Sequence, residues 1–330
     1  MRIILLLSVC MFLAGVFAQN SHTGKVVSLA FNESGTKLIS ASASESIVWD
    51  LNTSKSITTI KQKASLVYWL TERNQILIAG PDGVYLLDGE TFLVTDTLDS
   101  EKKLDGPYAV TPDGKYLFCR LRTSESEAWL YAINLHNFSA VENLNNKKHK
   151  LFNNALVFSV SSDSKYLYVL SNGIDVIQYS CDSFSELTRF NITKVHTDIS
   201  SAVCMAAGAE YLYVGGKCSS GSDGKEISRY LVNNQLTAFG ASPISGGVRA
   251  IAYSPLLKTL FIAALDMKIY TLKDDVGVIQ KFASIDRYPE SITVSADGKF
   301  LAIGTGFAKK STDNFPVLVF EIESGKVVLD

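Results

Sequence analysis

The residue types that most often carry chemistry in proteins are sparse in this chain and lie in no catalytic spacing. The histidines form no HExxH pair and no other spacing that would bring two of them to one metal ion. No G-x-S-x-G nucleophile elbow occurs either. We therefore predict no catalytic residue, no metal site and no cofactor. The four histidines are His22, His136, His149 and His196.

Basic side chains are concentrated in two long connections between predicted strands, at 143–154 and 304–316. They are Lys147, Lys148, His149 and Lys150 in the first connection and Lys309 and Lys310 in the second. Loops on a rigid scaffold commonly carry binding residues. We expect the two connections to share one face and to contact a partner there, with Phe307 and Tyr288 as aromatic anchors. The alternative is a solvated charged rim.

The elements that position these residues follow from a nine-residue segment that recurs seven times. Each copy starts with an apolar residue, continues through a polar or small turn, and has Leu at its eighth position. These leucines are Leu38, Leu77, Leu117, Leu167, Leu212, Leu260 and Leu301. An alternating apolar strand and then a fourth strand follow each copy. Four antiparallel strands in each of seven repeats of about 44 residues predict an all-β, seven-bladed β-propeller of four-stranded blades.

Three copies place an aspartate in the turn. Asp113, Asp163 and Asp297 each stand two residues before a lysine and next to Gly or Ser. Aspartate side chains commonly bond the main chain of such turns. We therefore predict that these three carboxylates are structural.

The first repeat, residues 22–53, resembles a WD-repeat. It begins with His22-Thr23-Gly24, contains a Ser-Gly turn, and ends in Trp49-Asp50. The resemblance implies that His22 belongs to the family's Asp–His–Ser–Trp network, which is incomplete here because Ser44 stands where the Asp is expected. The second and seventh repeats are more similar to the YVTN-type propellers of surface and periplasmic proteins.

The ring is predicted to close without a strand from the N-terminus. The resemblance to WD-repeats implies an N-terminal strand in the last blade, but only QNSHTG precedes the first predicted inner strand. The segment GKVVLD at 325–330 is typical of a fourth strand. We therefore predict that blade 7 is built wholly from the C-terminus and that closure depends on side-chain packing against blade 1.

The predicted inner strands also bear on whether the protein is an enzyme. They supply mainly small and apolar residues, with Arg249 and Glu290 the only ionisable ones, whereas an active site needs converging ionisable groups. We therefore favour a non-catalytic binding or scaffold module for a protein or glycan partner. The competing hypothesis is a lactonase-like propeller hydrolase with its site at the mouth of the central channel. A structural protein of a coat or wall is a third alternative.

Residues 1–18 predict a secretory signal peptide. Arg2 precedes an unbroken apolar run from Ile3 to Ala18, which is shorter than the roughly 20 residues that cross a bilayer. Val16 and Ala18 occupy the −3 and −1 positions of a cleavage site. The alternative is an uncleaved signal anchor. In either case we predict that residues 19–330 form a single secreted or lumenal domain with no stable membrane insertion after cleavage.

Cysteines and glycosylation motifs agree with that location. Cys119, Cys181, Cys204 and Cys218 are expected to be free, mostly buried thiols. The four N-x-S/T acceptors map to predicted turns or strand ends, and are Asn32, Asn52, Asn137 and Asn191.

Composition limits the partner. The chain has 31 basic and 33 acidic residues, a net charge of −2, and therefore no global positive field for nucleic acid. Its 330 residues are 47% hydrophobic, enough to bury the core of one large domain or two modest ones. We predict a monomeric domain that binds protein or glycan.

Overall fold

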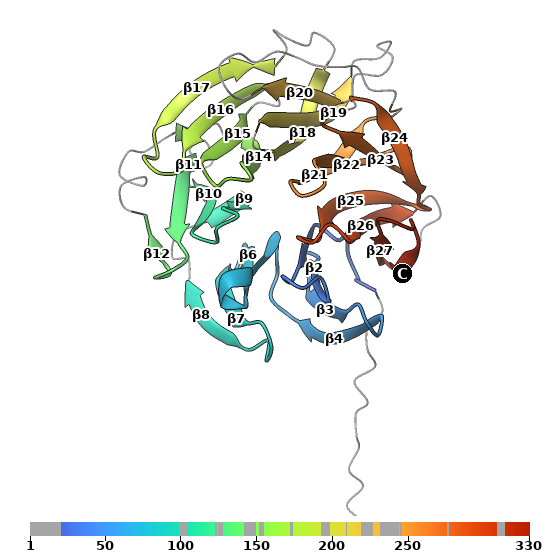
Figure 1. Ribbon diagram of the computed structural model, residues 1–330. Coiled ribbons are helices and arrows are strands. Elements are labelled where there is room, and N and C mark those ends of the chain that lie inside the picture. The colour runs from blue at the N-terminus through green and yellow to red at the C-terminus, as the bar shows by residue number, and fades with distance from the viewer. Residues whose placement is uncertain are drawn as a thin grey trace, which may run out of the picture.

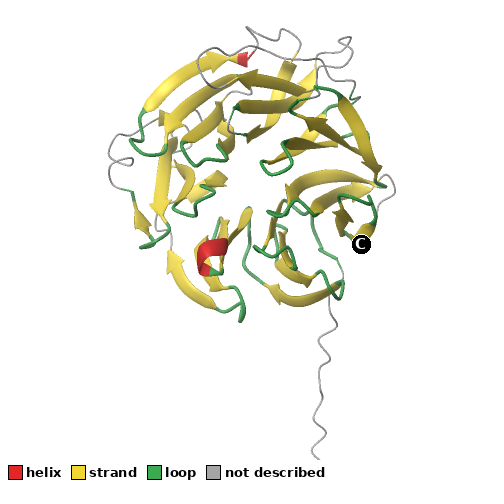
Figure 2. Ribbon diagram, viewed as in Figure 1, coloured by secondary structure: helices red, strands yellow, loops and turns green. Residues whose placement is uncertain are grey.

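The computed structural model shows seven antiparallel β-sheets arranged in a ring (Figure 1). It describes residues 21–98, 104–122, 124, 128–141, 150–151, 155–171, 174–192, 199–208, 210–218, 227–231, 244, 246–275, 277–308 and 314–330. Strands make up nearly all of the regular structure, and a 3-10 helix, η1 (Thr71–Arg73), joins two of them (Figure 2). The predicted all-β, seven-bladed propeller is confirmed, whereas the predicted signal peptide at 1–18 lies outside the described residues.

Each sheet, or blade, runs outward from its first strand. Blade 1 consists of β1 (Ser28–Phe31), β2 (Lys37–Ala41), β3 (Ser46–Asp50) and β4 (Lys55–Ile60). Blade 2 consists of β5 (Leu66–Leu70), β6 (Gln75–Gly80), β7 (Gly83–Asp88) and β8 (Val94–Leu98). Blade 3 consists of β9 (Leu104–Val110), β10 (Tyr116–Arg122), β11 (Ala128–Asn134) and β12 (Ser139–Ala140), with β13 (Lys150–Leu151) also paired to β11.

The remaining blades follow the same order. Blade 4 consists of β14 (Ala155–Val160), β15 (Tyr166–Ser171), β16 (Asp175–Ser180) and β17 (Glu186–Asn191). Blade 5 has three described strands, β18 (Ile199–Ala207), β19 (Tyr211–Cys218) and β20 (Ile227–Leu231). Blade 6 consists of β21 (Val248–Ser254), β22 (Thr259–Ala264), β23 (Lys268–Lys273) and β24 (Ile279–Ser284). Blade 7 consists of β25 (Arg287–Val294), β26 (Phe300–Ala308), β27 (Val317–Glu321) and β28 (Val327–Leu329).

Antiparallel order gives the ring two distinct ends. The first-to-second and third-to-fourth strand turns emerge at one end, which we call the turn face. The second-to-third connections and the connections between blades emerge at the other, the long-loop face. The predicted long connection at 304–316 starts too early, because β26 keeps pairing as far as Ala308.

The recurring leucines hold the blades against one another. All seven are fully buried. They belong to hydrophobic clusters that each combine residues of two adjacent blades, and the described residues form one cluster at every one of the seven blade interfaces. A single four-stranded sheet cannot bury both of its faces, so this interleaving is what stabilises the ring.

The aspartate turns are structural, as predicted. Asp163 Oδ1 accepts hydrogen bonds from the Ser161 hydroxyl at 2.6 Å and from the Lys165 main-chain N–H at 3.2 Å. Asp297 makes the same pair of bonds with Ser295 and Lys299. Partial burial alone would raise the pKa of Asp163 and Asp297, but these bonds outweigh it and lower both.

Blade 7 contains only C-terminal strands, as predicted, but its closure involves more than side-chain packing. The main chain of His22 pairs with that of Phe315 through two hydrogen bonds of 3.2 and 3.1 Å. The Val26 N–H donates to the Thr305 carbonyl at 3.0 Å. A Cβ on Gly304 would lie 2.6 Å from the Val26 carbonyl oxygen, so glycine is what allows this close approach.

His22 is buried and belongs to a side-chain network of blade 1. Its Nε2 lies 2.7 Å from the Ser40 hydroxyl, which also accepts a 2.7 Å hydrogen bond from the Trp49 indole N–H. The prediction that the network is incomplete at its acid agrees with the structure, because His22 Nδ1 makes no hydrogen bond to a described residue. The carboxylate beside His22 belongs to Glu45, whose Oε1 lies 3.7 Å from His22 Nδ1.

Three of the cysteines are free and buried, as predicted, namely Cys119, Cys181 and Cys204. Burial raises the pKa of all three thiols, to about 12 for Cys181 and Cys204. The side chain of Cys218 lies outside the described residues. Among the described residues there is no helix long and apolar enough to cross a membrane. The described part of the chain also holds no group of three or more potential metal ligands.

Candidate binding site

Blades 5 and 6 depart from the standard turn of the repeat. The turns between the first and second strands of blades 3, 4 and 7 carry Thr or Ser followed two residues later by Asp. In blade 5 the corresponding turn contains Gly208 and Glu210, and in blade 6 it contains Pro255, Leu256 and Leu257. Variation confined to loops of a rigid scaffold is where binding sites commonly occur.

A carboxylate in blade 6 replaces an apolar side chain of other blades. The main-chain N–H of Asp274, just after β23, donates to the carbonyl of Lys258 at 3.0 Å. The residues that make the equivalent bond in blades 1, 3, 4 and 7 are Leu51, Leu135, Cys181 and Ile322. All four are apolar or thiol side chains packed in the blade-interface clusters. A carboxylate at such a position needs hydrogen-bond partners.

Two tyrosines hold this carboxylate in place. The Tyr253 hydroxyl donates to Asp274 Oδ2 at 2.6 Å, and the hydroxyl of Tyr213, in blade 5, donates to Oδ1. The two rings stack with centroids 5.7 Å apart. Burial, followed by the hydrogen bond to Asp274 and the charge of Asp274, raises the pKa of both phenols. Both therefore remain protonated donors near neutral pH.

Gly208 and Arg229 complete the floor of the site. A Cβ on Gly208 would lie 2.9 Å from a ring carbon of Tyr253, so a larger residue would displace the ring. Arg229, a buried residue of β20, donates from Nη1 to the main-chain oxygen of Asp274 at 2.9 Å. Its guanidinium also lies 4.2 Å from the ring centroid of Tyr211. Blades 5 and 6 are thus tied together beneath the site.

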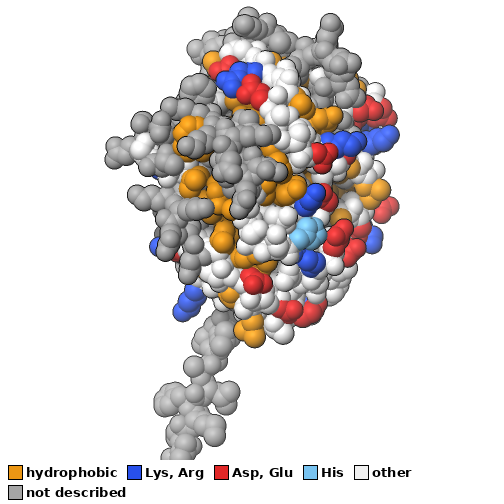
Figure 3. Space-filling model, turned by 90° about the vertical axis from the view of Figure 1, so that its left-hand side faces the viewer, with side chains coloured by type: hydrophobic (Ala, Val, Ile, Leu, Met, Phe, Trp, Pro, Cys, Tyr) orange, Lys and Arg blue, Asp and Glu red, His pale blue; other side chains and the backbone are white. Residues whose placement is uncertain are grey.

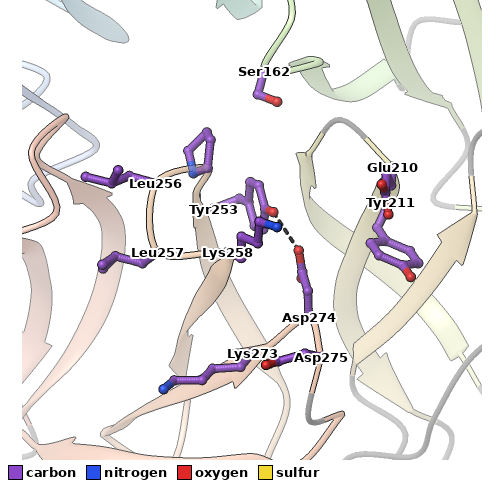
Figure 4. A pocket seen from close by; sticks show the side chains of 11 residues that line it. Ser162, Glu210, Tyr211, Tyr253, Leu256, Leu257, Lys258, Lys273, Asp274 and Asp275 are labelled. Carbon is purple, nitrogen blue, oxygen red and sulfur yellow. Dashed lines mark hydrogen bonds between the residues drawn. The ribbon is translucent and has the colours of Figure 1, made fainter.

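Above this floor the turns enclose a hollow of about 560 Å³ on the turn face (Figure 4). It is lined by Ser162, Glu210, Tyr211, Tyr253, Pro255, Leu256, Leu257, Lys258, Lys273, Asp274 and Asp275. Pockets that bind small ligands or short segments commonly enclose about 300–1,000 Å³. A second hollow, between blades 2 and 3, encloses about 10 Å³, roughly one water molecule.

The rim of the larger hollow combines an apolar wall with unneutralised charges. Figure 4 shows Leu256 and Leu257 on one side and Glu210 with Tyr211 on the other. Leu256 is 64% exposed. Within the described part of the chain, Glu210, Lys258, Lys273 and Asp275 form no salt bridge. These groups are therefore available to a bound molecule.

None of the basic side chains predicted to contact a partner is among the described ones. Residues Lys147, Lys148, His149, Lys309 and Lys310 lie outside the described residues, and Lys150 begins β13 with its side chain outside them. Their role on the long-loop face stays a prediction. The two predicted aromatic anchors are described: Phe307 is 60% exposed with Lys25 Nζ 4.8 Å from its ring centroid, and Tyr288 is half-buried.

The two ionisable residues of the predicted inner strands, Arg249 and Glu290, are brought together near the long-loop face. Arg249 Nε donates to Glu290 Oε2 at 2.8 Å, and Lys25 Nζ lies 2.8 Å from Glu290 Oε1. Gly306 makes room for this carboxylate, because a Cβ there would lie 2.6 Å from Glu290 Oε1. Two cations thus neutralise one nearly buried carboxylate.

Sequence reasoning missed a second inner-strand carboxylate, Asp105. Its Oδ2 accepts hydrogen bonds from Arg120 at 2.8 Å and Arg122 at 2.6 Å. Burial raises the pKa of Asp105, but the arginines outweigh it and lower the pKa overall. The residue was missed because β9 begins at Leu104, before the strand expected from the repeat. The opposite charges of Asp105 and of Arg120 and Arg122 could have indicated this cluster, but only from the pairing register of β9 and β10.

The glycosylation candidates occupy blades 1, 3 and 4. Asn52 and Asn137 are exposed in turns of the turn face, and Asn32 and Asn191 are half-buried. The Asn32 amide donates to Ser34 and accepts from the Lys37 N–H, and the Asn191 amide donates to Asp175. No N-x-S/T motif follows residue 191 in the sequence. The sector of blades 5 and 6 that carries the hollow therefore has no acceptor.

The chain matches no known protein-family profile and no curated protein.

Proposed function

We propose that this protein is a secreted or secretory-pathway β-propeller that binds a protein or glycan partner and performs no chemistry itself. The observation that carries the proposal is the hollow of blades 5 and 6, in which Asp274 replaces a core residue and is fixed by Tyr213 and Tyr253. A carboxylate kept at such a position, under turns that leave the repeat pattern, is best explained by recognition of another molecule.

The polar groups of the hollow suit binding better than proton transfer. A general acid or base works best when its pKa lies near the working pH. The phenols of Tyr213 and Tyr253 have raised pKa values and remain donors. Near the opposite face, Glu290 and Asp105 are each paired with two cations. These groups act as fixed donors and acceptors.

Surface charge is consistent with a partner that is neither nucleic acid nor an anionic membrane. On the side of the ring seen in Figure 3, basic and acidic side chains are intermixed. The net charge is −2. A mixed surface gives specificity through local pairs rather than through a long-range field. We include in this proposal a WD-repeat relationship for blade 1, which the His22–Ser40–Trp49 bonds support.

Photo-cross-linking in a secreting eukaryotic cell tests the proposal. A photoreactive amino acid placed at position 256 of the full chain should yield a specific adduct in the medium or secretory lumen. The same amino acid at Leu93, which is 68% exposed on blade 2, is the matched control and should yield none. Retention in the cytosol, equal adducts at both positions, or hydrolysis of lactone or ester substrates by the purified chain would contradict the proposal.

A further inference from the structure

We infer that the hollow of blades 5 and 6 binds an extended segment of a partner protein, with an apolar side chain against Leu256 and a basic residue beside Glu210. This inference rests on the proposed binding function and chooses protein over glycan as the partner. We choose protein for three reasons: the aromatic rings already contact other groups of the chain, Leu256 is exposed, and the lining is charged.

The tyrosine rings of the hollow already contact other groups of the protein. The Tyr253 ring stacks on Tyr213 and lies against Gly208. The Arg229 guanidinium lies over the Tyr211 ring, 4.2 Å from its centroid. Sugars in protein sites commonly pack on an open aromatic face, and stacking of this kind is favourable only where the face is free. The ring contacts therefore favour a ligand that does not need a stacking platform.

The apolar wall is the feature that a protein segment would use. Leu256 is 64% exposed beside Pro255, at the tip of the turn between β21 and β22. Leu257 below it packs partly into the interface with blade 7, which fixes the turn. An apolar side chain inserted against Leu256 would bury both surfaces at about 25 cal/mol per Å². A few well-packed anchor residues carry most of the binding energy of a protein interface.

The charged residues that line the hollow would orient the bound segment. The lining holds three carboxylates, Glu210, Asp274 and Asp275, against two lysines. Figure 4 shows Glu210 across the hollow from the leucines, and Lys273 extending away from Tyr253. Because Glu210 has no salt bridge to a described residue, a basic side chain of the partner can pair with it without displacing a cation.

Panning a phage-displayed library of random dodecapeptides against the immobilised full chain tests this inference. The selected peptides should share an apolar residue next to Lys or Arg. Leu256→Asp should weaken their binding by about tenfold or more, and Glu210→Lys should do the same by repelling the basic residue. Leu93→Asp is the matched control and should leave binding unchanged.

A glycan array probed with the same protein separates the outcomes. Binding to glycans that Leu256→Asp abolishes, with no peptide selected, overturns this inference and leaves the proposed function standing. If neither peptides nor glycans bind in a way that depends on position 256, both fail. Unchanged thermal unfolding of the two charge variants shows that they fold, since both positions lie on exposed turns.

Discussion

The hydroxyl of Tyr253 and the carboxylate of Asp274 are joined by a 2.6 Å hydrogen bond at the end of blade 6, where blades 1, 3, 4 and 7 pack apolar or thiol side chains. Tyr213 reaches the same carboxylate from blade 5. The pair therefore joins two blades through a polar contact in place of an apolar one, directly beneath the hollow.

Asp274→Ala should lower the free energy of unfolding by about 2–3 kcal/mol. The change removes the acceptor of both phenols and leaves the Tyr213 hydroxyl, on a fully buried residue, without it. Urea unfolding followed by tryptophan fluorescence measures the effect. Asp275→Ala, on an exposed neighbour, is the control and should stay within about 0.5 kcal/mol. Equal effects of the two substitutions would contradict the structural role of Asp274.

Stability should fall as the pH drops from 6.5 toward 4, because of His22. Burial lowers its pKa from 6.5 to about 4, and the nearby charge of Glu45 opposes this only in part. Between pH 6.5 and 4, His22 therefore binds a proton in the unfolded chain but not in the folded chain. The full contribution is present above pH 6.5, and on the order of 3 kcal/mol is lost by pH 4.

Unfolding of His22→Gln at pH 7.0, 5.5 and 4.5 isolates this contribution. The variant should be less stable at pH 7 and should show a shallower pH dependence than the native chain. His136→Gln, in an exposed turn of blade 3, should keep the native slope. The same slope in the native chain and in His22→Gln would show that another group is responsible.

Gly304→Ala should destabilise the ring by about 2 kcal/mol or more. The new methyl group would lie 2.2 Å from the Ser291 hydroxyl and 2.6 Å from the Val26 carbonyl oxygen, at the seam between blades 7 and 1. Gly24→Ala is the control, since its nearest neighbour would be 3.8 Å away. Thermal unfolding measures both, and a similar melting temperature for the two variants would refute the close approach at Gly304.

If the chain enters the secretory pathway, Asn52 and Asn137 should carry glycans more fully than Asn32 and Asn191. The first two are exposed in turns, whereas the Nδ2 atoms of the other two, to which a glycan would be attached, donate hydrogen bonds. Peptide mapping after enzymatic deglycosylation of the secreted chain measures occupancy at each site. Full occupancy of Asn32 with none at Asn52 would reverse the expected order.

The sequence was sufficient to predict the ring. The recurring leucines are fully buried in all seven blades, so their spacing reports the architecture directly. Asp113, Asp163 and Asp297 could be interpreted for a similar reason, because each turn is closed by residues within five positions.

The site could not be predicted in the same way, because it depends on residues far apart in the chain. Tyr213 and Asp274 are 61 positions apart and meet only because adjacent blades stack. The approach of Glu45 to His22, at 3.7 Å between Oε1 and Nδ1, likewise joins residues from different parts of blade 1. Asp105 was missed because a strand boundary was placed too late.

The most direct test is the dissociation constant of the partner recovered by cross-linking at position 256, measured by calorimetry with the purified full chain and its variants. Leu256→Asp should raise the constant by about tenfold or more, and Leu93→Asp should change it by less than about twofold. Equal affinity for all three proteins would mean that the hollow of blades 5 and 6 is not the binding site.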